Sequence, residues 1–308
     1  MKILRHAKPG HDTAIAVGSF DGVHLGHQAL MRRVVEEARA RGLQSAVLSF
    51  EPLPREFFEP GRAPPRLTSL AERLAAIEAT GVEAVFVQRF DRRFAALSAD
   101  EFHHRLREHH RARWVAVGEN FQYGARRQGN ARVLAEAGPR LGFEVEALGA
   151  VACDGERISS TRVRAALAAG DFDLATRLLG RRYAICGRVV HGAKRGKSLG
   201  FPTANVRLGR AKPALHGIFA VKCFGAATRG LEGVASLGIN PAVQVGGPAT
   251  LEAFLFDFSG DLYGRRLTIE FLKKLRDEAH FASLEELAAQ IRDDCDAARE
   301  YFRAPGNR

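Results

Sequence analysis

Two histidines close a glycine-rich segment near the start of the chain, Gly18-Ser-Phe-Asp-Gly-Val-His-Leu-Gly-His27. The segment lies between a short apolar run and a helical pattern, so it ends at a helix N-terminus, where free N–H groups attract phosphate. Glycine lets the backbone approach such an anion closely, and the two histidines, His24 and His27, add donors that can follow charge developing on phosphorus. The segment predicts phosphate chemistry, with nucleotide contacts from Gly18, Phe20 and Gly22.

The alternative for these histidines is a purely structural role at a helix start, which is the better interpretation for an isolated histidine. Two histidines that flank a glycine after a buried strand favour phosphate chemistry instead. No nucleophilic side chain is required, because a phosphate on one substrate can attack the α-phosphorus of ATP and expel pyrophosphate. The protein then contributes alignment and charge stabilisation.

A second polar group is Ile158-Ser-Ser-Thr-Arg-Val-Arg164, which precedes an alanine-rich helical stretch. Its three hydroxyl residues and another helix N-terminus can converge on phosphate, and Arg164 offers a permanently charged fork of donors. The alternative is a helix cap followed by a surface arginine. We expect ATP contacts from Ser159, Ser160 and Thr161.

A third group, in the second half of the chain, is a basic glycine-rich loop that ends in Pro-Thr-Ala-Asn205. Backbone N–H groups of such a loop, which contains Gly196, can cradle phosphates. Thr203 and Asn205 point the same way on an extended strand, and their oxygens suit Mg²⁺. The pattern is not a P-loop. Without further context, both residues would be interpreted as turn residues.

The elements that must position these groups differ between the two halves. Up to about residue 180, short apolar runs alternate with helical patterns, which predicts a Rossmann-like parallel sheet covered by helices. The expected strands are Ala14–Val17, Ala46–Phe50, Ala84–Val87, Trp114–Gly118 and Glu144–Leu148. The first helix is expected to bury Leu30, Met31, Val34, Val35 and Ala38.

From residue 181 onward, β-like runs separated by Gly, Pro and Asp turns predict a small antiparallel barrel or sandwich. The clearest runs are Tyr183–Val190, Gly217–Phe224, Leu251–Phe256 and Arg266–Phe271. Ser283 and Glu286 form a capping box before a terminal amphipathic helix, and two similar boxes start helices at Ser69 and Ser98. We therefore expect two domains, residues 1–180 and 181–308.

The string at 18–27 resembles the flavin branch of the HxGH nucleotidyltransferases, and matching segments follow at 49–58, 117–124, 142–149 and 158–164. The loop at 187–205 resembles the riboflavin kinase motif, and that resemblance continues through 216–221, 233–241, 251–252, 258–264 and 271–278. In this order the segments are similar to bacterial bifunctional riboflavin kinase/FAD synthetases. This chain departs from the family pattern at three positions. It has Leu53, Ala242 and Phe254 where His, Thr and His, respectively, are usual.

The resemblance implies that riboflavin is phosphorylated by ATP to FMN, and that FMN is then adenylylated by ATP to FAD. It assigns Mg-ATP to Thr203 and Asn205, and it makes Glu252 the general base for the riboflavin hydroxyl. Asn120 and Arg276 are the expected flavin contacts, although each has an ordinary alternative, as a loop residue and as a surface charge. His24, His27 and Arg164 are the expected catalytic residues of adenylyl transfer.

Bulk properties set limits on the function. A formal charge of +11 over 308 residues indicates an anionic partner. Nucleic acid is the alternative class, but the sequence shows no recognised motif and no aromatic interleaving for base stacking. The N-terminus lacks the apolar core of a signal peptide, and the cysteines are widely spaced. We expect a cytoplasmic enzyme with small-molecule partners, no nucleic acid, no membrane and at most weak homo-oligomerisation. A chain with only the adenylyltransferase half fully active is a further alternative.

Overall fold

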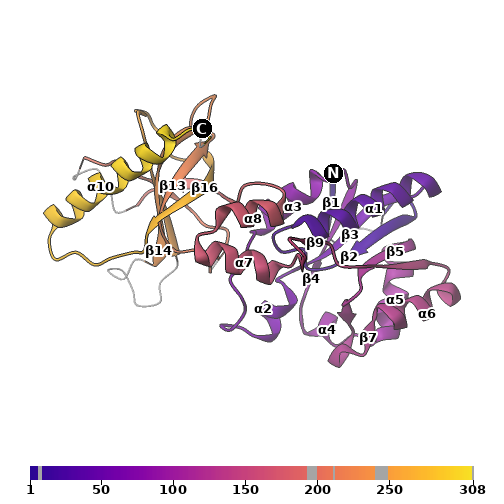
Figure 1. Ribbon diagram of the computed structural model, residues 1–308. Coiled ribbons are helices and arrows are strands. Elements are labelled where there is room, and N and C mark those ends of the chain that lie inside the picture. Colours follow the sequence, from indigo (N-terminus) through magenta and orange to yellow (C-terminus); the bar gives the residue numbers. More distant parts are fainter. Residues whose placement is uncertain (6–8, 193–199, 211, 240–248, 307–308) are drawn as a thin grey trace. The chain divides into compact units, whose positions relative to one another are not determined.

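The computed structural model describes residues 1–5, 9–192, 200–210, 212–239 and 249–306 (Figure 1). The chain forms two compact units, the first from residues 1–64 and 73–159 and the second from residues 65–72 and 160–308. Each unit is described by itself. Within the described part of the chain, no helix is both long enough and apolar enough to cross a membrane.

The first unit contains a parallel sheet with the strand order β1-β4-β3-β2-β5-β8. The strands are β1 (Lys2–Leu4), β2 (Thr13–Val17), β3 (Gln44–Glu51), β4 (Ala84–Arg89), β5 (Ala112–Gly118) and β8 (Glu144–Leu148). All five predicted strands are confirmed. Strand β1 was not predicted, because its three residues, of which two are exposed, are too few to show a periodicity. Strand order reverses between β2 and β5, so the carboxyl end of β2 is a switch point, where ligands bind in such sheets.

Helices flank this sheet, and two short two-stranded sheets lie in its connecting segments. The helices are α1 (Leu25–Arg41), α2 (Pro54–Phe58), α3 (Leu70–Glu78), α4 (Arg92–Ala95), α5 (Ala99–Glu108), η1 (Ala125–Arg127) and α6 (Ala131–Leu141). The pairs are β6 (Gln122–Tyr123) with β7 (Gly129–Asn130), and β9 (Ala152–Cys153) with β10 (Glu156–Arg157). The predicted inner face of α1 is buried, except that Val35 is only half-buried.

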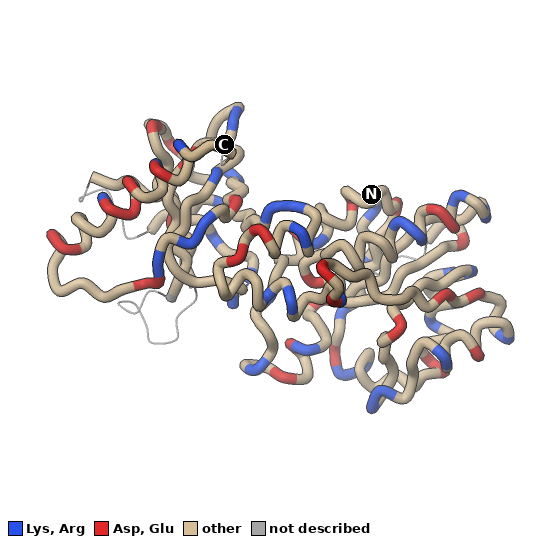
Figure 2. Tube along the Cα trace, in the orientation of Figure 1, with Lys and Arg blue, Asp and Glu red and all other residues tan. Residues whose placement is uncertain are grey.

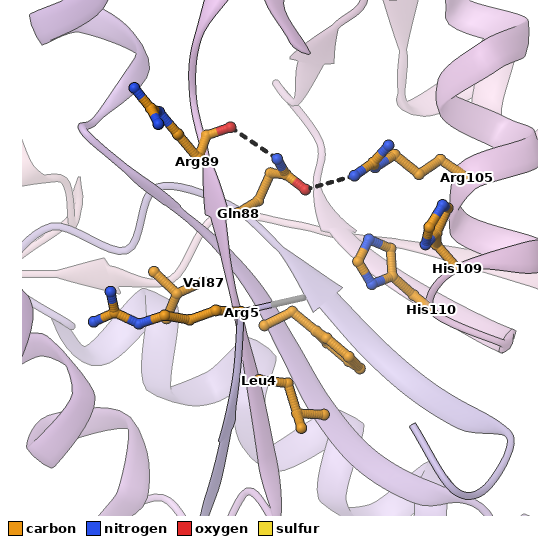
Figure 3. Close-up of a pocket in the computed structure, with 9 residues that line it drawn as sticks. Leu4, Arg5, Val87, Gln88, Arg89, Arg105, His109 and His110 are labelled. Carbon is orange, nitrogen blue, oxygen red and sulfur yellow. Dashed lines mark hydrogen bonds between the residues drawn. The ribbon is translucent and has the colours of Figure 1, made fainter. Parts of the chain in front are cut away.

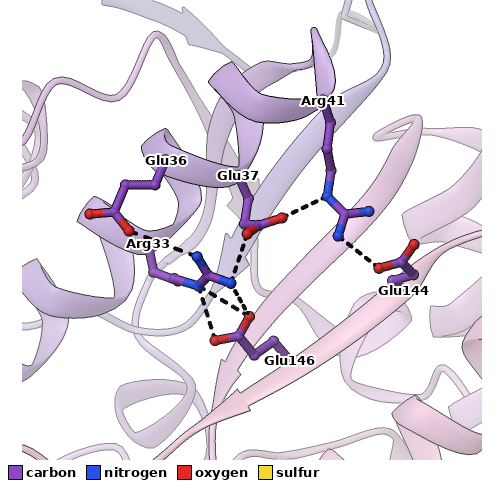
Figure 4. Close-up of polar contacts among 6 residues, drawn as sticks. All are labelled: Arg33, Glu36, Glu37, Arg41, Glu144 and Glu146. Carbon is purple, nitrogen blue, oxygen red and sulfur yellow. Dashed lines mark hydrogen bonds and ion pairs between the residues drawn. The ribbon is translucent and has the colours of Figure 1, made fainter.

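Ion pairs join the outer side of α1 to strand β8 (Figure 4). The Arg33 guanidinium contacts both Glu37 and Glu146, and its Nε donates to Glu146 Oε1 at 3.1 Å. The Arg41 Nη2 atom lies 2.8 Å from Glu144 Oε2. These side chains are partly exposed, so each pair contributes little alone, and the network mainly fixes the direction of α1.

Two of the three capping boxes predicted at helix starts are complete, and the third has only one of its two bonds. The Ser98 hydroxyl accepts from the Glu101 N–H at 3.2 Å, and the Glu101 carboxylate accepts from the Ser98 N–H at 2.7 Å. Ser69 and Glu72 make the same two bonds. At the terminal helix, Ser283 accepts from Glu286, whose carboxylate accepts from the N–H of residue 282 instead of residue 283.

The second unit is a closed six-stranded antiparallel barrel with the order β11-β12-β15-β14-β13-β16. Its strands are β11 (Ala184–Val190), β12 (Ala204–Val206), β13 (Gly217–Phe224), β14 (Leu231–Ile239), β15 (Ala249–Leu255) and β16 (Arg266–Arg276). Helices α7 (Ser160–Ala169) and α8 (Phe172–Leu179) precede it, and α10 (Leu284–Arg303) follows it. Cys295, Ala298 and Phe302 of α10 pack on Ile218 and Val234 of the barrel. The predicted small antiparallel barrel with a terminal helix is confirmed.

Candidate functional site

The turn that follows β2 is held in a strained conformation by the core beneath it. Phe20 and Val23 have φ angles of +53° and +43°, which L-residues with side chains rarely adopt. Both side chains are almost completely buried, so packing stabilises what local sterics disfavour. Gly22 also has a positive φ, and a Cβ on Gly18 would press against the Phe20 ring. The glycines predicted to shape this turn are therefore required by it.

His24 and His27 lie together at the start of α1. His24 is the N-cap residue, and its Nδ1 accepts from the His27 backbone N–H at 3.3 Å. The two imidazole rings stack with centroids 3.6 Å apart. The Phe20 ring lies nearly perpendicular to the His27 ring, with centroids 5.2 Å apart. A Cβ on Gly26 would lie 3.2 Å from the His24 ring, so the glycine between the histidines permits the stack.

The protonation of the two rings follows from these contacts. Burial, with a smaller contribution from His24, holds the pKa of His27 well below its usual range. His27 is therefore neutral at pH 7. Because His24 Nδ1 accepts a hydrogen bond, a neutral His24 carries its proton on Nε2. The pair thus presents N–H donors without placing two positive charges side by side.

Arg73 supports this turn from below and was not predicted from the sequence. Its side chain is 1% exposed. Its Nη1 donates to the Ser19 carbonyl at 3.0 Å, and its Nη2 donates to the Phe50 carbonyl at 2.9 Å and to Glu51 at 2.7 Å. The Ser49 hydroxyl donates to the same Ser19 carbonyl. A helical arginine looks like a solvated charge in sequence, so no local pattern distinguishes Arg73.

A cavity of about 750 Å³ opens beside the turn in the same unit. Gly18 and Ser19 line one side, and Asn120, the predicted flavin contact, lies on the wall with its amide donating to Glu119. Seven aromatic residues form the largest group on the remaining wall: Phe50, Phe58, Phe90, Phe94, Phe102, Phe121 and Tyr123. Its charged residues are Arg55, Glu59, Arg126 and Arg127. These aromatic residues come from separate segments, so the sequence alone did not reveal them as one surface.

A buried histidine fixes one aromatic residue of that cavity. His103 Nε2 and the Tyr123 hydroxyl are 2.5 Å apart, and Tyr123 stacks on Phe121 with centroids 5.3 Å apart. Burial raises the pKa of Tyr123, so the phenol stays protonated at neutral pH. The aromatic wall is thus held by a defined hydrogen bond as well as by packing.

The segment with three hydroxyl residues has the predicted relation to a helix. Ser160 is the first residue of α7, so Ser159, Ser160 and Thr161 surround its N-terminus. Within the second unit, Arg164 Nε donates to the Pro65 carbonyl at 2.5 Å. Ser159 is counted with the first unit, and Ser160, Thr161 and Arg164 with the second.

In the barrel, three predicted residues converge. Asn205 of β12 lies opposite Glu252 of β15, and Ser236 of β14 pairs with Glu252 from the other side. The Thr203 hydroxyl donates to Glu252 Oε2 at 3.2 Å. A Cβ on Gly192 would overlap the Asn205 amide, so glycine at 192 leaves room for that side chain. Gly196 and the Ala242 departure lie outside the described residues.

Oxygen atoms dominate this group and suit Mg²⁺. The hydroxyl, amide oxygen and carboxylate of Thr203, Asn205 and Glu252 are the hard ligands that this ion prefers. Among the described residues, no three His, Cys, Asp or Glu side chains are grouped in a way that could hold a metal ion. Any Mg²⁺ at this position would therefore retain water or substrate phosphate as further ligands, which is its usual behaviour.

Arg276, the other predicted flavin contact, is tied to the terminal helix. Its Nε and Nη2 each donate to the Asp294 carboxylate at 2.7 Å, and its guanidinium lies over the Phe281 ring. Gln290 donates to the same carboxylate at 3.2 Å. A bidentate pair of this kind fixes the guanidinium plane.

A glycine-rich histidine turn on a parallel sheet and an oxygen-rich polar group on a barrel are the features expected of enzymes that transfer phosphorus groups from nucleotides. The FAD synthetase family model matches residues 6–162, and the riboflavin kinase model matches residues 179–302. The chain belongs to the family of bifunctional riboflavin kinase/FMN adenylyltransferases. The predicted family and its two enzyme activities are thereby confirmed.

Relatives named "Bifunctional riboflavin kinase/FMN adenylyltransferase" match along nearly the whole chain. The Escherichia coli K12 protein is 45% identical, with 98% of each chain covered. The Pseudomonas fluorescens protein is 47% identical, covering 96% of this chain and 95% of its own. A solved structure titled "Crystal Structure of Macrolide-efflux Protein from Streptococcus pneumoniae" has a TM-score of 0.82 at 29% identity, covering 98% of this chain and 100% of its own.

Proposed function

We propose that the barrel half makes FMN and that the sheet half converts this FMN to FAD, with residues 181–308 and 1–180 as the two domains. The observation that carries the proposal is the presence of two separate phosphate-handling groups in one chain. His24 and His27 stack at a helix N-terminus in one unit, and Thr203 and Glu252 are hydrogen-bonded in the other. ATP and a flavin are the substrates at both sites.

For adenylyl transfer, a phosphate oxygen of FMN attacks the α-phosphorus of ATP, and the bond to the β-phosphate oxygen breaks to release pyrophosphate. His24 and His27 donate to phosphate oxygens as charge shifts toward the leaving group. Gly18, Phe20 and Gly22 shape the turn that receives the nucleotide. The remaining ATP contacts in this proposal are Ser159, Ser160, Thr161 and Arg164.

The aromatic cavity supports a flavin position beside the histidine turn. An isoalloxazine ring stacks well on aromatic side chains, and a cavity of about 750 Å³ lies within the usual range for such ligands. Gly18 and Asn120 line the same cavity, so a flavin bound there has one end close to the turn. Arg55, Arg126 and Arg127 complement the FMN phosphate.

For the kinase step, Glu252 accepts the proton from the riboflavin 5′-hydroxyl while that oxygen attacks the γ-phosphorus of ATP, and ADP leaves. Thr203 and Asn205 hold Mg²⁺, which neutralises phosphate charge when bound. The glycine-rich sequence that contains Gly196 is the proposed phosphate contact of this step. Arg276 contacts the flavin, and its pair with Asp294 supports a fixed orientation for that contact.

We also propose a cytoplasmic location and no nucleic-acid or membrane partner, with self-association weak at most. The charge of +11 is explained by two sites that each bind a triphosphate. Among the described residues, lysine and arginine occur in both units and alternate along the trace with other residue types (Figure 2). Such scatter differs from the basic stripe expected of a nucleic-acid-binding protein.

Two variants test the division of labour. His27→Ala should let FMN accumulate from riboflavin, because adenylyl transfer loses a donor while the barrel is unchanged; a loss of about 10²–10³ in kcat is expected. Asn205→Ala should block FMN formation and leave conversion of supplied FMN to FAD intact. Products are separated by chromatography, with exposed His104→Ala as the control.

Equal loss of both steps in either variant would contradict two separate sites. The unmodified chain could instead form FAD normally from supplied FMN but form no FMN from riboflavin. That result would show that only the adenylyltransferase half of the chain is active.

A further inference from the structure

A small cavity of about 140 Å³ lies in the first unit, apart from the residues assigned above (Figure 3). It is lined by the ends of β1 and β4 and by the C-terminal end of α5. Five of its nine lining residues are basic types, and none is acidic: Arg5, Arg89, Arg105, His109 and His110. A cavity with this lining attracts an anion.

His110 is the buried residue of this cavity. It is 6% exposed, and neither ring nitrogen has a hydrogen-bond partner among the described residues. The Thr13 hydroxyl donates to the His110 carbonyl at 2.7 Å, and the Phe86 ring packs against the imidazole with centroids 4.7 Å apart. The ring is therefore held in place with its polar atoms unused. Buried polar atoms are nearly always hydrogen-bonded, which indicates a ligand or water at this position.

Arg105 brings a permanent charge that no described carboxylate neutralises. Its Nη2 donates to the Gln88 amide oxygen at 3.0 Å, and Gln88 donates to the Arg89 carbonyl at 2.8 Å (Figure 3). The Arg105 Nε is buried and has no partner among the described residues. The neutral Gln88 amide orients the Arg105 guanidinium but does not neutralise its charge. The remaining N–H donors can therefore bind an anion.

We propose that this cavity binds a small oxyanion, inorganic phosphate, through Arg105 and His110. The volume is less than a fifth of the aromatic cavity, which is too small for a flavin or a whole nucleotide. Burial, with Arg105 and His109, lowers the pKa of His110 to about 3, so the neutral ring has one N–H to donate to an oxyanion. Bound phosphate would connect β1, β4 and α5, and would stabilise this unit by mass action.

The test follows the His110 ring signals by NMR in the full chain during titration with sodium phosphate at constant ionic strength. Assignment comes from the spectrum of His110→Gln. The expected result is a saturable shift whose midpoint rises at least about tenfold in Arg105→Gln, equivalent to about 1.4 kcal/mol. The exposed Arg132→Gln is the matched control and should leave the midpoint unchanged.

The same titration in His27→Ala excludes signals transmitted from phosphate at the nucleotide turn, and there the shift should persist. No His110 shift, an equal midpoint in Arg105→Gln, or an identical response to sodium chloride would overturn the site. AMP provides the second arm. A weaker shift with AMP than with phosphate is expected, and an equal shift would overturn the assignment to inorganic phosphate.

Discussion

At the scale of single residues, the protonation of His27 decides which hydrogen bonds the turn can offer to a phosphate. A neutral ring donates one hydrogen bond without repelling its stacked neighbour His24. Burial is the main cause of the low pKa, so the ring should resist protonation well below the usual range of a histidine. The pair acts as a preorganised donor set.

The pKa of His27 gives a direct prediction. Because a lowered pKa keeps the neutral form as pH falls, the His27 ring signals should stay constant between about pH 8 and pH 5.5 in NMR spectra. The spectrum of His27→Ala assigns the signals. A His27 titration midpoint near 6.5 in the ligand-free chain would show that the ring is solvated and would contradict the buried stack.

Glu252 carries the second prediction at this scale. Glu252→Gln removes the proton acceptor but keeps the size of the side chain and an oxygen for the Thr203 hydroxyl, so the kinase rate should fall by about 10²–10⁴. Adenylylation of supplied FMN should be unchanged. Glu232→Gln on neighbouring β14 is the matched control. If the kinase rate of Glu252→Gln lay within a factor of two of the rate of the unmodified chain, Glu252 would not be the general base.

At the scale of elements, α10 is held to β16 by one nearly buried ion pair. Asp294→Ala would leave the Arg276 guanidinium without its bidentate partner, and we expect the unit to lose about 1–3 kcal/mol of unfolding free energy. Asp293→Ala, the exposed neighbour on the same helix, is the control. The measurement is urea unfolding followed by a probe in the barrel. Equal stability of the two variants would show that the pair contributes only orientation.

Elements with strong local patterns were predictable from sequence. Ser98 and Glu101 identified a helix start because the capping box is local. Glu144–Leu148 was predicted to the residue because polar and apolar residues alternate at its start and Gly142 and Gly149 lie on either side. The edge strand β1 was missed, because its pairing depends on a partner more than 80 residues away in the sequence.

The same distinction holds for the sites. The glycines and histidines of the turn are contiguous, so their chemistry was readable. Arg73 and the aromatic cavity were not, because their members come together only when α3, β3, β4 and the segment at 120–124 fold. Glu252 lies far in sequence from Thr203 and Asn205, and family resemblance had to supply a grouping that strand register now explains.

At the scale of the whole molecule, two units with different architectures perform successive steps on one flavin. The barrel step consumes ATP and leaves ADP, whereas the sheet step consumes a second ATP and leaves pyrophosphate. The formal charge of +11 suits the two triphosphates that these steps consume. The two steps are thus distinguished by their phosphorus products.

The most direct test of this account incubates the purified chain with riboflavin, ATP and Mg²⁺ and follows flavins by chromatography together with released pyrophosphate. The account predicts that FMN forms first, that FAD follows, and that one pyrophosphate appears per FAD and none per FMN. Folded protein that formed neither FMN nor FAD, or released pyrophosphate while only FMN accumulated, would contradict it.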